Sequence, residues 1–267
     1  MLKDITLGQF FPGNSVVHRL DPRTKLILVV AYIVALFTAD WFISYALVLA
    51  CLVAVIGVSG VQPKTILKSL KPLLFIILLT GLLNLFYTEG KVLVEFWIFK
   101  ITWQGIEKAF FMVLRISLLV AGTFMLTYTT SPISLTDGLE QLLRPLNKIR
   151  VPVHELSMMM CIALRFIPTL TQETAKIISA QKARGADFES GNLLNRARAL
   201  VPLLVPLFIS SFRRADELAT AMECRCYHGG EGRTKMKQLR YGKLDAMAFL
   251  LGALVLGSVI VLRCFGF

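Results

Sequence analysis

Long apolar runs alternate with short polar segments along most of the chain, which is the pattern of a membrane protein. The hydrocarbon core of a bilayer is about 30 Å thick, and about 20 apolar residues in a helix cross it. One helix over residues 26–58 would be roughly 50 Å long, so we expect two shorter helices with a break at Thr38-Ala39-Asp40. The pattern predicts five membrane spans: Leu26–Ala39, Trp41–Val58, Pro72–Tyr87, Trp103–Tyr128 and Asp245–Leu262.

The residues before the first run predict how its helix begins. Asp21 can cap the helix, with Pro22 in the first turn, where its missing N–H costs nothing. We expect Lys25 to extend its ammonium group to the lipid headgroups, as long cationic side chains do near the end of a span.

Residues 129–243 differ from the rest, because they hold 17 Lys and Arg against 10 Asp and Glu. Their apolar stretches, Leu156–Leu170 and Ala199–Ile209, are too short for a comfortable span and contain prolines. We interpret them as amphipathic helices of a cytosolic insert. The predicted division is therefore an N-terminal membrane part (1–128), the insert (129–243) and a last membrane helix (244–267).

Composition and charge support this class of protein. Of 267 residues, 55% are hydrophobic and only 17% charged, and the net charge is +12. This apolar content excludes disorder, and five scattered cysteines do not make a disulfide scaffold. Basic residues alternate with lipid-like runs, so we expect no nucleic-acid partner. Basic loops alternate with non-basic ones, which predicts a cytosolic N-terminus.

Two short arginine motifs close the two long helical patterns of the insert. They are Ala183-Arg184-Gly185 and Cys224-Arg225-Cys226, with arginines 41 positions apart. We expect Gly185, and Gly229-Gly230, to supply the left-handed caps of these helices. An arginine between small neighbours can enter a partner's groove and make a forked contact with a carboxylate. Alternatively, each is an ordinary cation that balances the helix dipole.

Apolar side chains recur at helical spacing upstream of both motifs. One interpretation is a face that holds a membrane partner, and the other is packing between the two helices. The candidate partner-contacting residues are Leu156, Met160, Leu164, Leu200, Leu204 and Phe208.

The chain shows no pattern typical of an enzyme or a secondary carrier. It lacks a phosphate-binding loop, and its three histidines lie far apart, so we assign no catalytic residue, no metal site and no bound cofactor. A secondary carrier would place carboxylates inside its spans, and here the predicted spans hold almost no ionisable group. Arg115 is the exception: a charge at that depth is often functional, and the alternative, which we prefer, is a structural pair with a helix neighbour or a backbone carbonyl.

These motifs resemble a known family, the transmembrane (T) components of energy-coupling factor (ECF) vitamin transporters. The resemblance rests on the two X-Arg-X motifs, the span pattern, the start Gly8-Gln9-Phe10-Phe11-Pro12-Gly13-Asn14-Ser15 and the segment His18-Arg19-Leu20-Asp21-Pro22-Arg23-Thr24-Lys25. Ala183-Arg184-Gly185 matches the first family motif directly, and the second has cysteines where other small residues are common.

The resemblance implies an all-α integral membrane protein with about five spans and three long cytosolic coupling helices, at about 132–149, 152–186 and 191–228. It implies a non-catalytic scaffold in the plasma membrane of a bacterium. Its partners would be two ATP-binding-cassette ATPases, which use ATP and Mg²⁺ and hold the motif arginines, and a small substrate-binding membrane (S) subunit on the apolar faces. The scaffold would transmit the motion of the ATPases to that subunit.

Overall fold

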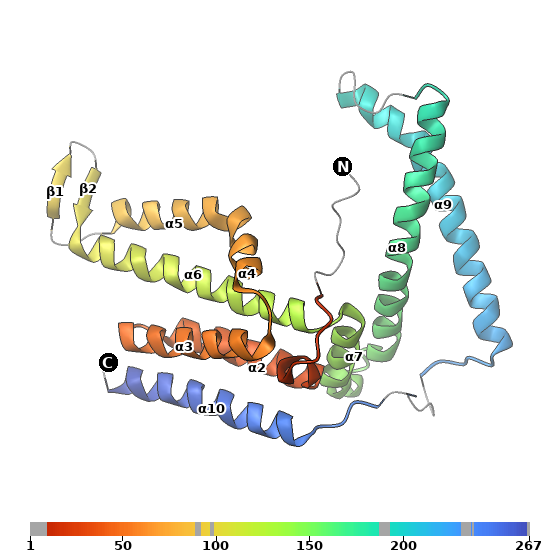
Figure 1. The fold of residues 1–267 in the computed structure, drawn as a ribbon. Coiled ribbons are helices and arrows are strands. Elements are labelled where there is room, and N and C mark those ends of the chain that lie inside the picture. Colours follow the sequence, from red (N-terminus) through yellow and green to blue (C-terminus); the bar gives the residue numbers. More distant parts are fainter. Residues whose placement is uncertain are drawn as a thin grey trace. The chain divides into compact units, whose positions relative to one another are not determined.

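The computed structural model describes residues 10–88, 92–96, 99–186, 193–230, 236 and 238–265. The regular secondary structure of these residues is helical apart from one two-stranded hairpin, which confirms the all-α membrane class (Figure 1). Residues 8 and 9, which begin the family-like start of the chain, lie outside the described part. The chain divides into two compact units, a helical bundle (residues 8–139 and 239–267) and a crossed-helix unit (residues 140–238), and we describe each by itself.

The helical bundle is built from about the N-terminal half of the chain and the last helix. Its helices are α1 (Val16–Arg19), α2 (Pro22–Thr38), α3 (Phe42–Ser59), α4 (Pro63–Leu70), α5 (Leu74–Tyr87), α6 (Trp103–Thr129) and α10 (Lys243–Cys264). A short 3-10 turn, Lys71–Leu73, joins α4 to α5, and α7 (Pro132–Leu143) begins in this unit.

The ends of α2 and α3 lie where the polar residues predict them. The Asp21 side chain caps α2 by accepting a hydrogen bond of 2.9 Å from the Arg23 backbone N–H, and Pro22 is the first helical residue. The predicted break is present, because α2 ends at Thr38 and α3 begins at Phe42. Gly60 adopts the left-handed conformation (φ 72°) that ends α3.

The core of the bundle lies between α2, α3, α4, α6 and α10. Its largest fully buried side chains include Tyr45, Tyr128, Leu36 and Val48. The hydroxyl of Tyr128 hydrogen-bonds Ser69 of α4, so the ring's polar end is satisfied as its body is buried. The last helix packs along α2, although more than 200 residues separate them in sequence.

A small hairpin interrupts the helical pattern between α5 and α6. Strands β1 (Val92–Phe96) and β2 (Phe99–Thr102) pair antiparallel, with Glu95 opposite Lys100 and Phe96 opposite Phe99. Thr102 ends β2 and also caps α6, because its hydroxyl accepts a bond of 3.0 Å from the Gly105 N–H. The sequence analysis did not predict these strands.

The crossed-helix unit contains the C-terminal end of α7, a 3-10 turn (Arg144–Ile149), α8 (Val153–Ala183) and α9 (Leu193–Cys224). The helices α7, α8 and α9 lie within the three segments that the family resemblance marks as coupling helices, of which residues 191 and 192 are outside the described part, and their coupling role stays a prediction. Pro168 lies inside α8, and Pro202 and Pro206 lie inside α9, yet both helices continue through them.

Five helical segments of the described chain are long and apolar enough to cross a membrane: Phe42–Ser59, Pro63–Tyr87, Trp103–Thr129, Val153–Ala183 and Lys243–Cys264. Four of them coincide with predicted spans to within a few residues or contain them. The fifth, α8, is the least apolar and belongs to the segment that we interpret as cytosolic, so its position outside the membrane stays a prediction. The remaining predicted span corresponds to α2, which at 17 residues is shorter than any of the five.

Candidate functional site

The first arginine motif forms the C-terminal cap of α8. Arg184 follows the last helical residue, and Gly185 is left-handed, with φ 86°. The Gly185 N–H donates to Lys182 O and the Ala186 N–H donates to Gln181 O, both at 3.0 Å. This pair of bonds is a Schellman motif, which satisfies the last carbonyl groups of the helix and turns the chain away from its axis. The predicted role of Gly185 is confirmed.

The second motif forms the same cap at the end of α9. Arg225 follows the last helical residue, the Cys226 N–H donates to Glu223 O at 2.8 Å, and the Tyr227 N–H donates to Met222 O at 3.0 Å. The left-handed residue is Cys226, with φ 55°, so the prediction that Gly229-Gly230 supplies this cap was wrong. A side chain in this conformation costs roughly 1–2 kcal/mol, which Gly185 avoids.

Both arginines therefore occupy the same position of the same capping motif. Both side chains are exposed, as are their neighbours Ala183, Gly185, Cys224 and Cys226. Within the described part of the chain, no ion pair holds either guanidinium group. Each lies beside the partial negative charge of a helix C-terminus, which favours a cation there. The geometry leaves both forks of hydrogen-bond donors open to another molecule.

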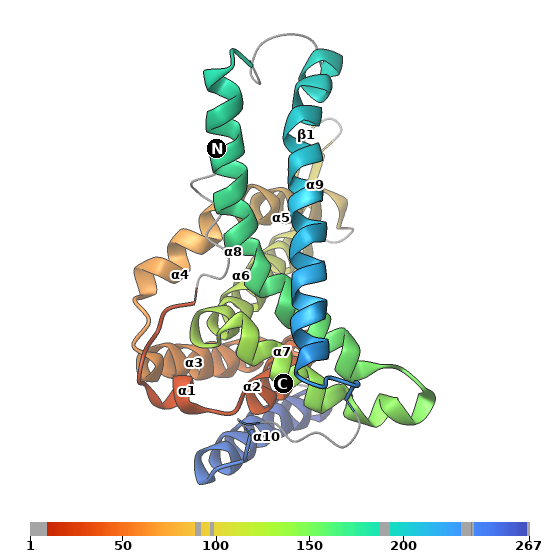
Figure 2. The ribbon, with the colours of Figure 1, turned by 90° about the vertical axis from the view of Figure 1, so that its right-hand side faces the viewer.

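The two caps lie at opposite ends of the crossed-helix unit. Figure 2 shows α8 and α9 packed against each other and running in opposite directions. A polar contact joins them near the middle, where the Glu173 carboxylate accepts from the Ser210 hydroxyl and, at 3.1 Å, from the Arg214 guanidinium.

Each arginine lies eleven residues beyond this contact, from 173 to 184 in α8 and from 214 to 225 in α9. At 1.5 Å per residue each arm is about 16 Å long, so the two caps are about 33 Å apart. A single small groove therefore cannot hold both arginines.

The predicted partner-contacting residues are mostly exposed. Leu156, Met160, Leu200 and Leu204 are each close to half exposed, and Phe208 is 61% exposed. Leu164 is half-buried, and Leu203, the neighbour of Leu204, is buried. Packing between α8 and α9 thus accounts for little of this surface. An apolar area of this extent is typical of a surface that contacts lipid or another protein.

A contact that the sequence analysis missed supports the end of α9. Gly230 lies against the imidazole of His154 at the start of α8, and a Cβ added at Gly230 would come within 2.4 Å of that ring. His154 in turn hydrogen-bonds Glu140 through Nδ1 at 3.1 Å. Gly230 thus serves close packing rather than helix capping, and only the three-dimensional fold brings it to His154.

Comparisons with known proteins agree with this arrangement. A family model described as CbiQ, "Cobalt transport protein", matches residues 13–236. Three relatives share the name "Energy-coupling factor transporter transmembrane protein EcfT". That of Thermosediminibacter oceani is 56% identical over 259 residues, 97% of this chain and 98% of the relative. That of Clostridium kluyveri is 54% identical over 264 residues (98% and 97%), and that of Bacillus subtilis is 46% identical over 261 residues (97% and 98%).

The chain belongs to the EcfT family. The family predicted from the arginine motifs and the span pattern is therefore confirmed. Membership makes the chain a transmembrane component of an energy-coupling factor transporter, which is a multi-subunit complex, and a multi-pass membrane protein. The matched region includes both arginine motifs.

In this EcfT family member, a buried charge cluster ties the start of α2 to the start of α10. The Asp245 carboxylate is 4% exposed and accepts from the Asp21 N–H at 2.9 Å and the Gly242 N–H at 2.8 Å. Arg23 pairs with Asp21 at 2.9 Å and stacks over the Tyr241 ring at 4.0 Å. These contacts join an N-terminal helix of the bundle, α2, to its C-terminal helix, α10.

The cluster determines the charge state of Asp21. Burial acts to raise the pKa of this carboxyl group, but hydrogen bonds from the Arg23 side chain and backbone outweigh it, with help from the charges of Arg23 and Lys25. The pKa of Asp21 is therefore below its usual value. The carboxylate stays ionised and keeps both its cap and its ion pair.

Lys25 contradicts the expectation that it reaches the lipid headgroups. It is only 6% exposed, and its ammonium group donates to Thr129 O at 2.9 Å, to the Thr130 hydroxyl at 3.2 Å and to His18 O at 3.4 Å. These acceptors lie at the ends of α1 and α6. The C-terminus of α6 lies within reach of the Lys25 ammonium group. Carbonyl groups without a helical partner at that end attract the ammonium more than the lipid headgroups do.

Arg115 has the structural role that we expected. It donates to the Tyr45 hydroxyl at 2.7 Å and to Ala39 O at 2.9 Å, and lies 3.8 Å from the Asp40 carboxylate. Arg263 pairs with the same carboxylate at 3.3 Å. Arg115 thus joins α6 to the turn between α2 and α3.

Proposed function

We propose that this chain is the non-catalytic coupling scaffold of an ATP-driven importer for vitamins or related micronutrients. In this proposal Arg184 and Arg225 each dock into a groove on one ATP-binding-cassette ATPase. The observation that carries it is the equivalence of the two arginines: each is exposed at the same position of a Schellman cap. Two identical structural ends on one chain fit two copies of one kind of partner.

The geometry of the two ends supports separate ATPase sites. Because the caps are about 33 Å apart, the guanidinium groups of Arg184 and Arg225 contact two separate surfaces of the partners. Each fork can pair with two oxygens of one carboxylate, which gives direction as well as attraction. The small flanking residues leave the arginine unshielded, and the sharp turn after it keeps the following chain out of the groove.

The exposed apolar side chains support the second partner. Leu156, Met160, Leu200, Leu204 and Phe208 give α8 and α9 a surface that a small substrate-binding membrane subunit would cover. In this proposal ATP binding and hydrolysis, with Mg²⁺, take place on the ATPases. Motion of the ATPases moves α8 and α9, and these reorient the membrane subunit. The scaffold itself binds no cofactor.

Topology and cargo complete the proposal. We place the N-terminus and the crossed-helix unit in the cytosol of a bacterium, because basic segments border them. The family model is named for cobalt and the relatives are not named for any cargo. In a scaffold the substrate-binding subunit selects the cargo, and vitamin uptake follows from the resemblance described above.

Arginine substitutions test the ATPase contacts. Removing one arginine from a buried charge pair typically costs about 2–5 kcal/mol, which corresponds to a loss of about 30-fold or more in affinity. The two arms share one assembly, so each remaining contact benefits from a high effective concentration. We therefore expect Arg184→Ala and Arg225→Ala each to reduce uptake more than assembly, and the double variant to lose the ATPases. Co-purification and vesicle uptake measure these effects.

The matched control is Arg213→Ala, an exposed arginine of α9 away from both caps. It should leave assembly and uptake unchanged. If the double variant retains both ATPases and full uptake, the arginines act only as cations at helix ends and the docking proposal is wrong.

A charge on the apolar face tests the contact with the membrane subunit. We expect Leu204→Asp to reduce co-purification of this subunit while the ATPases stay bound, since it places a charge in an apolar contact. Ala219→Asp, at an exposed position of the same helix nearer its C-terminus, is the control. Loss of both kinds of partner together would mean that Leu204 serves internal packing.

A further inference from the structure

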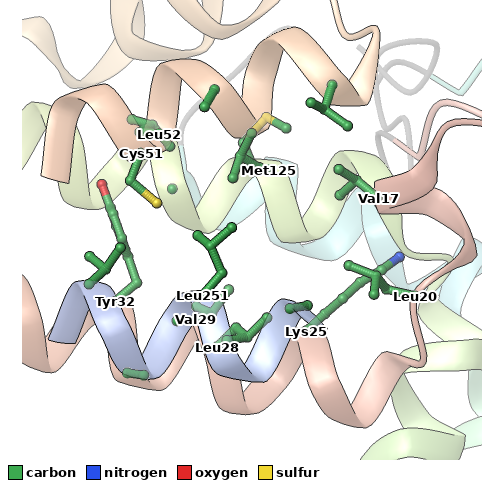
Figure 3. Close-up of a pocket in the computed structure, with 18 of the residues that line it drawn as sticks. Val17, Leu20, Lys25, Leu28, Val29, Tyr32, Cys51, Leu52, Met125 and Leu251 are labelled. Carbon is green, nitrogen blue, oxygen red and sulfur yellow. The ribbon is translucent and has the colours of Figure 1, made fainter. Parts of the chain in front are cut away.

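An apolar cleft of about 570 Å³ lies inside the helical bundle, between α1, α2, α3, α6 and α10. Figure 3 shows that it is elongated along the helices, with Val17, Leu20 and Lys25 at one end and Tyr32, Cys51 and Leu52 at the other. None of its lining residues belongs to the arginine caps or to α8 and α9, and the proposed function does not use it.

The polar groups that line the cleft are already bonded. The Lys25 ammonium has three acceptors, the Tyr32 hydroxyl donates to Leu118 O at 2.8 Å, and the Thr129 hydroxyl donates to Met125 O at 2.7 Å. Apart from the weakly polar thiol of Cys51, the other lining side chains are aliphatic or methionine. A buried water needs two to four polar partners, and apolar cavities stay dry. The lining therefore suits a hydrocarbon group better than ordered water.

The size and direction of the cleft fit an extended chain. An apolar cavity of about 150 Å³ holds one benzene molecule, and this cleft is roughly four times larger. Its lining on α2 runs from Lys25 to Ala35, ten residues or about 15 Å along the helix. Three of its walls, α3, α6 and α10, are long and apolar enough to span the membrane. The long axis thus follows the direction of lipid tails.

Two exposed cations are sequence neighbours of residues that line the cleft. Arg19 lies between the lining residues Val17 and Leu20, and Lys243 immediately precedes the lining residue Leu244. The nearby acids are engaged, since Asp21 pairs with Arg23 and Asp245 accepts from two backbone N–H groups. Arginine and lysine at this level are suited to a phosphate group.

We propose that the cleft is a phospholipid site that holds one acyl chain of a bilayer lipid, with the lipid phosphate at Arg19 and Lys243. The lipid fills the space between α2, α3 and α10. An anionic headgroup such as phosphatidylglycerol is preferred there over a zwitterionic one, because the exposed charges of Arg19 and Lys243 are positive.

Native mass spectrometry of the full chain tests this proposal. The chain is reconstituted in vesicles of phosphatidylglycerol and phosphatidylcholine, extracted in mild detergent and weighed. We expect one retained phospholipid, mainly phosphatidylglycerol. Ala248→Phe fills the cleft from α10 and should lower retention about tenfold, the effect of about two lost methylene contacts. Ala253→Phe, at an exposed position of α10 outside the lining, should not change it.

Two further variants separate lipid binding from folding. Ala54→Phe fills the same cleft from α3 and should lower lipid retention as Ala248→Phe does. At least one of these two variants should keep the melting temperature of the wild type, which shows that its fold is intact. A double change, Arg19→Gln with Lys243→Gln, should remove the preference for phosphatidylglycerol but keep an acyl chain bound. Equal retention by the wild-type chain and a folded cleft-filling variant would overturn the proposal, as would a wild-type chain that carries detergent only.

Discussion

Replacing Asp245 by alanine should destabilise the helical bundle strongly. The carboxylate is buried and accepts from two backbone N–H groups, of Asp21 and Gly242. A hydrogen bond to a charged group contributes about 1.5–3 kcal/mol, so losing both costs about 3–6 kcal/mol. The change also removes the negative charge near Lys25. For a chain of this size, 1 kcal/mol shifts the melting temperature by about 2–4 °C, so we expect a decrease of about 10 °C.

Thermal unfolding of the purified chain in detergent, followed by circular dichroism, measures this decrease. Asp245→Asn keeps one acceptor oxygen and should fall between the wild type and the alanine variant. Glu107→Ala is the matched control, because Glu107 is an exposed acid of α6, and such changes usually stay within about 0.5 kcal/mol. A shift below about 2 °C for Asp245→Ala would refute the view that this carboxylate joins α2 to α10.

Three further predictions concern the caps, the base of α9 and pH. Cys226→Gly should stabilise the end of α9 by about 1 kcal/mol, and Gly185→Ala should destabilise the end of α8 by a similar amount. Amide hydrogen exchange at the two helix ends should therefore slow in the first variant and speed up in the second. Changes of the same sign in both variants would contradict the left-handed backbone of Cys226 and Gly185. Gly230→Ala should displace the His154 ring and lower the melting temperature, and an unchanged chemical shift of that ring would argue against the contact. Because the pKa of Asp21 is lower in the folded chain than in the unfolded chain, its carboxylate stabilises the fold above pH about 4, and this stabilisation is lost as the pH falls through the pKa of the folded state. Asp21→Asn should therefore lose less stability in acid than the wild type, and melting temperature measured against pH tests this.

Local signals in the sequence predicted the helices and their ends well. Apolar runs of membrane length, the Asp21-Pro22 start and the break before Asp40 depend on neighbours in sequence, so one sequence suffices to find them. The hairpin between α5 and α6 was missed because its strands are four and five residues long and interrupt neither apolar run.

A contact between distant residues explains the error at Lys25, and a local backbone preference explains the one at Cys226. Lys25 bonds Thr129 and Thr130, more than 100 positions away, so only the fold shows that the ammonium turns inward. Cys226 was overlooked as a cap because cysteine rarely adopts a left-handed backbone, and glycines stood close by as better candidates.

The candidate site was predicted in part. Arg184 and Arg225 are exposed at helix ends, as their small neighbours indicate, but their equivalence became visible only from the backbone bonds of the two caps. The apolar stripe left two interpretations open, since periodicity locates a face without saying what covers it. Exposure favours an external partner for most of the stripe, and half-buried Leu164 is the exception.

The ion pair between Glu173 and Arg214 lies eleven residues before the arginine at the end of each helix, so the C-terminal arms of α8 and α9 beyond it are of equal length. Two rigid rods pinned at such a point behave like the blades of scissors. An opening of about 10° for one rod moves its tip by about 3 Å, given an arm of about 16 Å. The same opening of the other rod moves its tip equally far in the opposite sense. Because the two arms are equally long, a force applied at Arg184 is balanced by an equal force at Arg225, and neither end of the unit has a mechanical advantage.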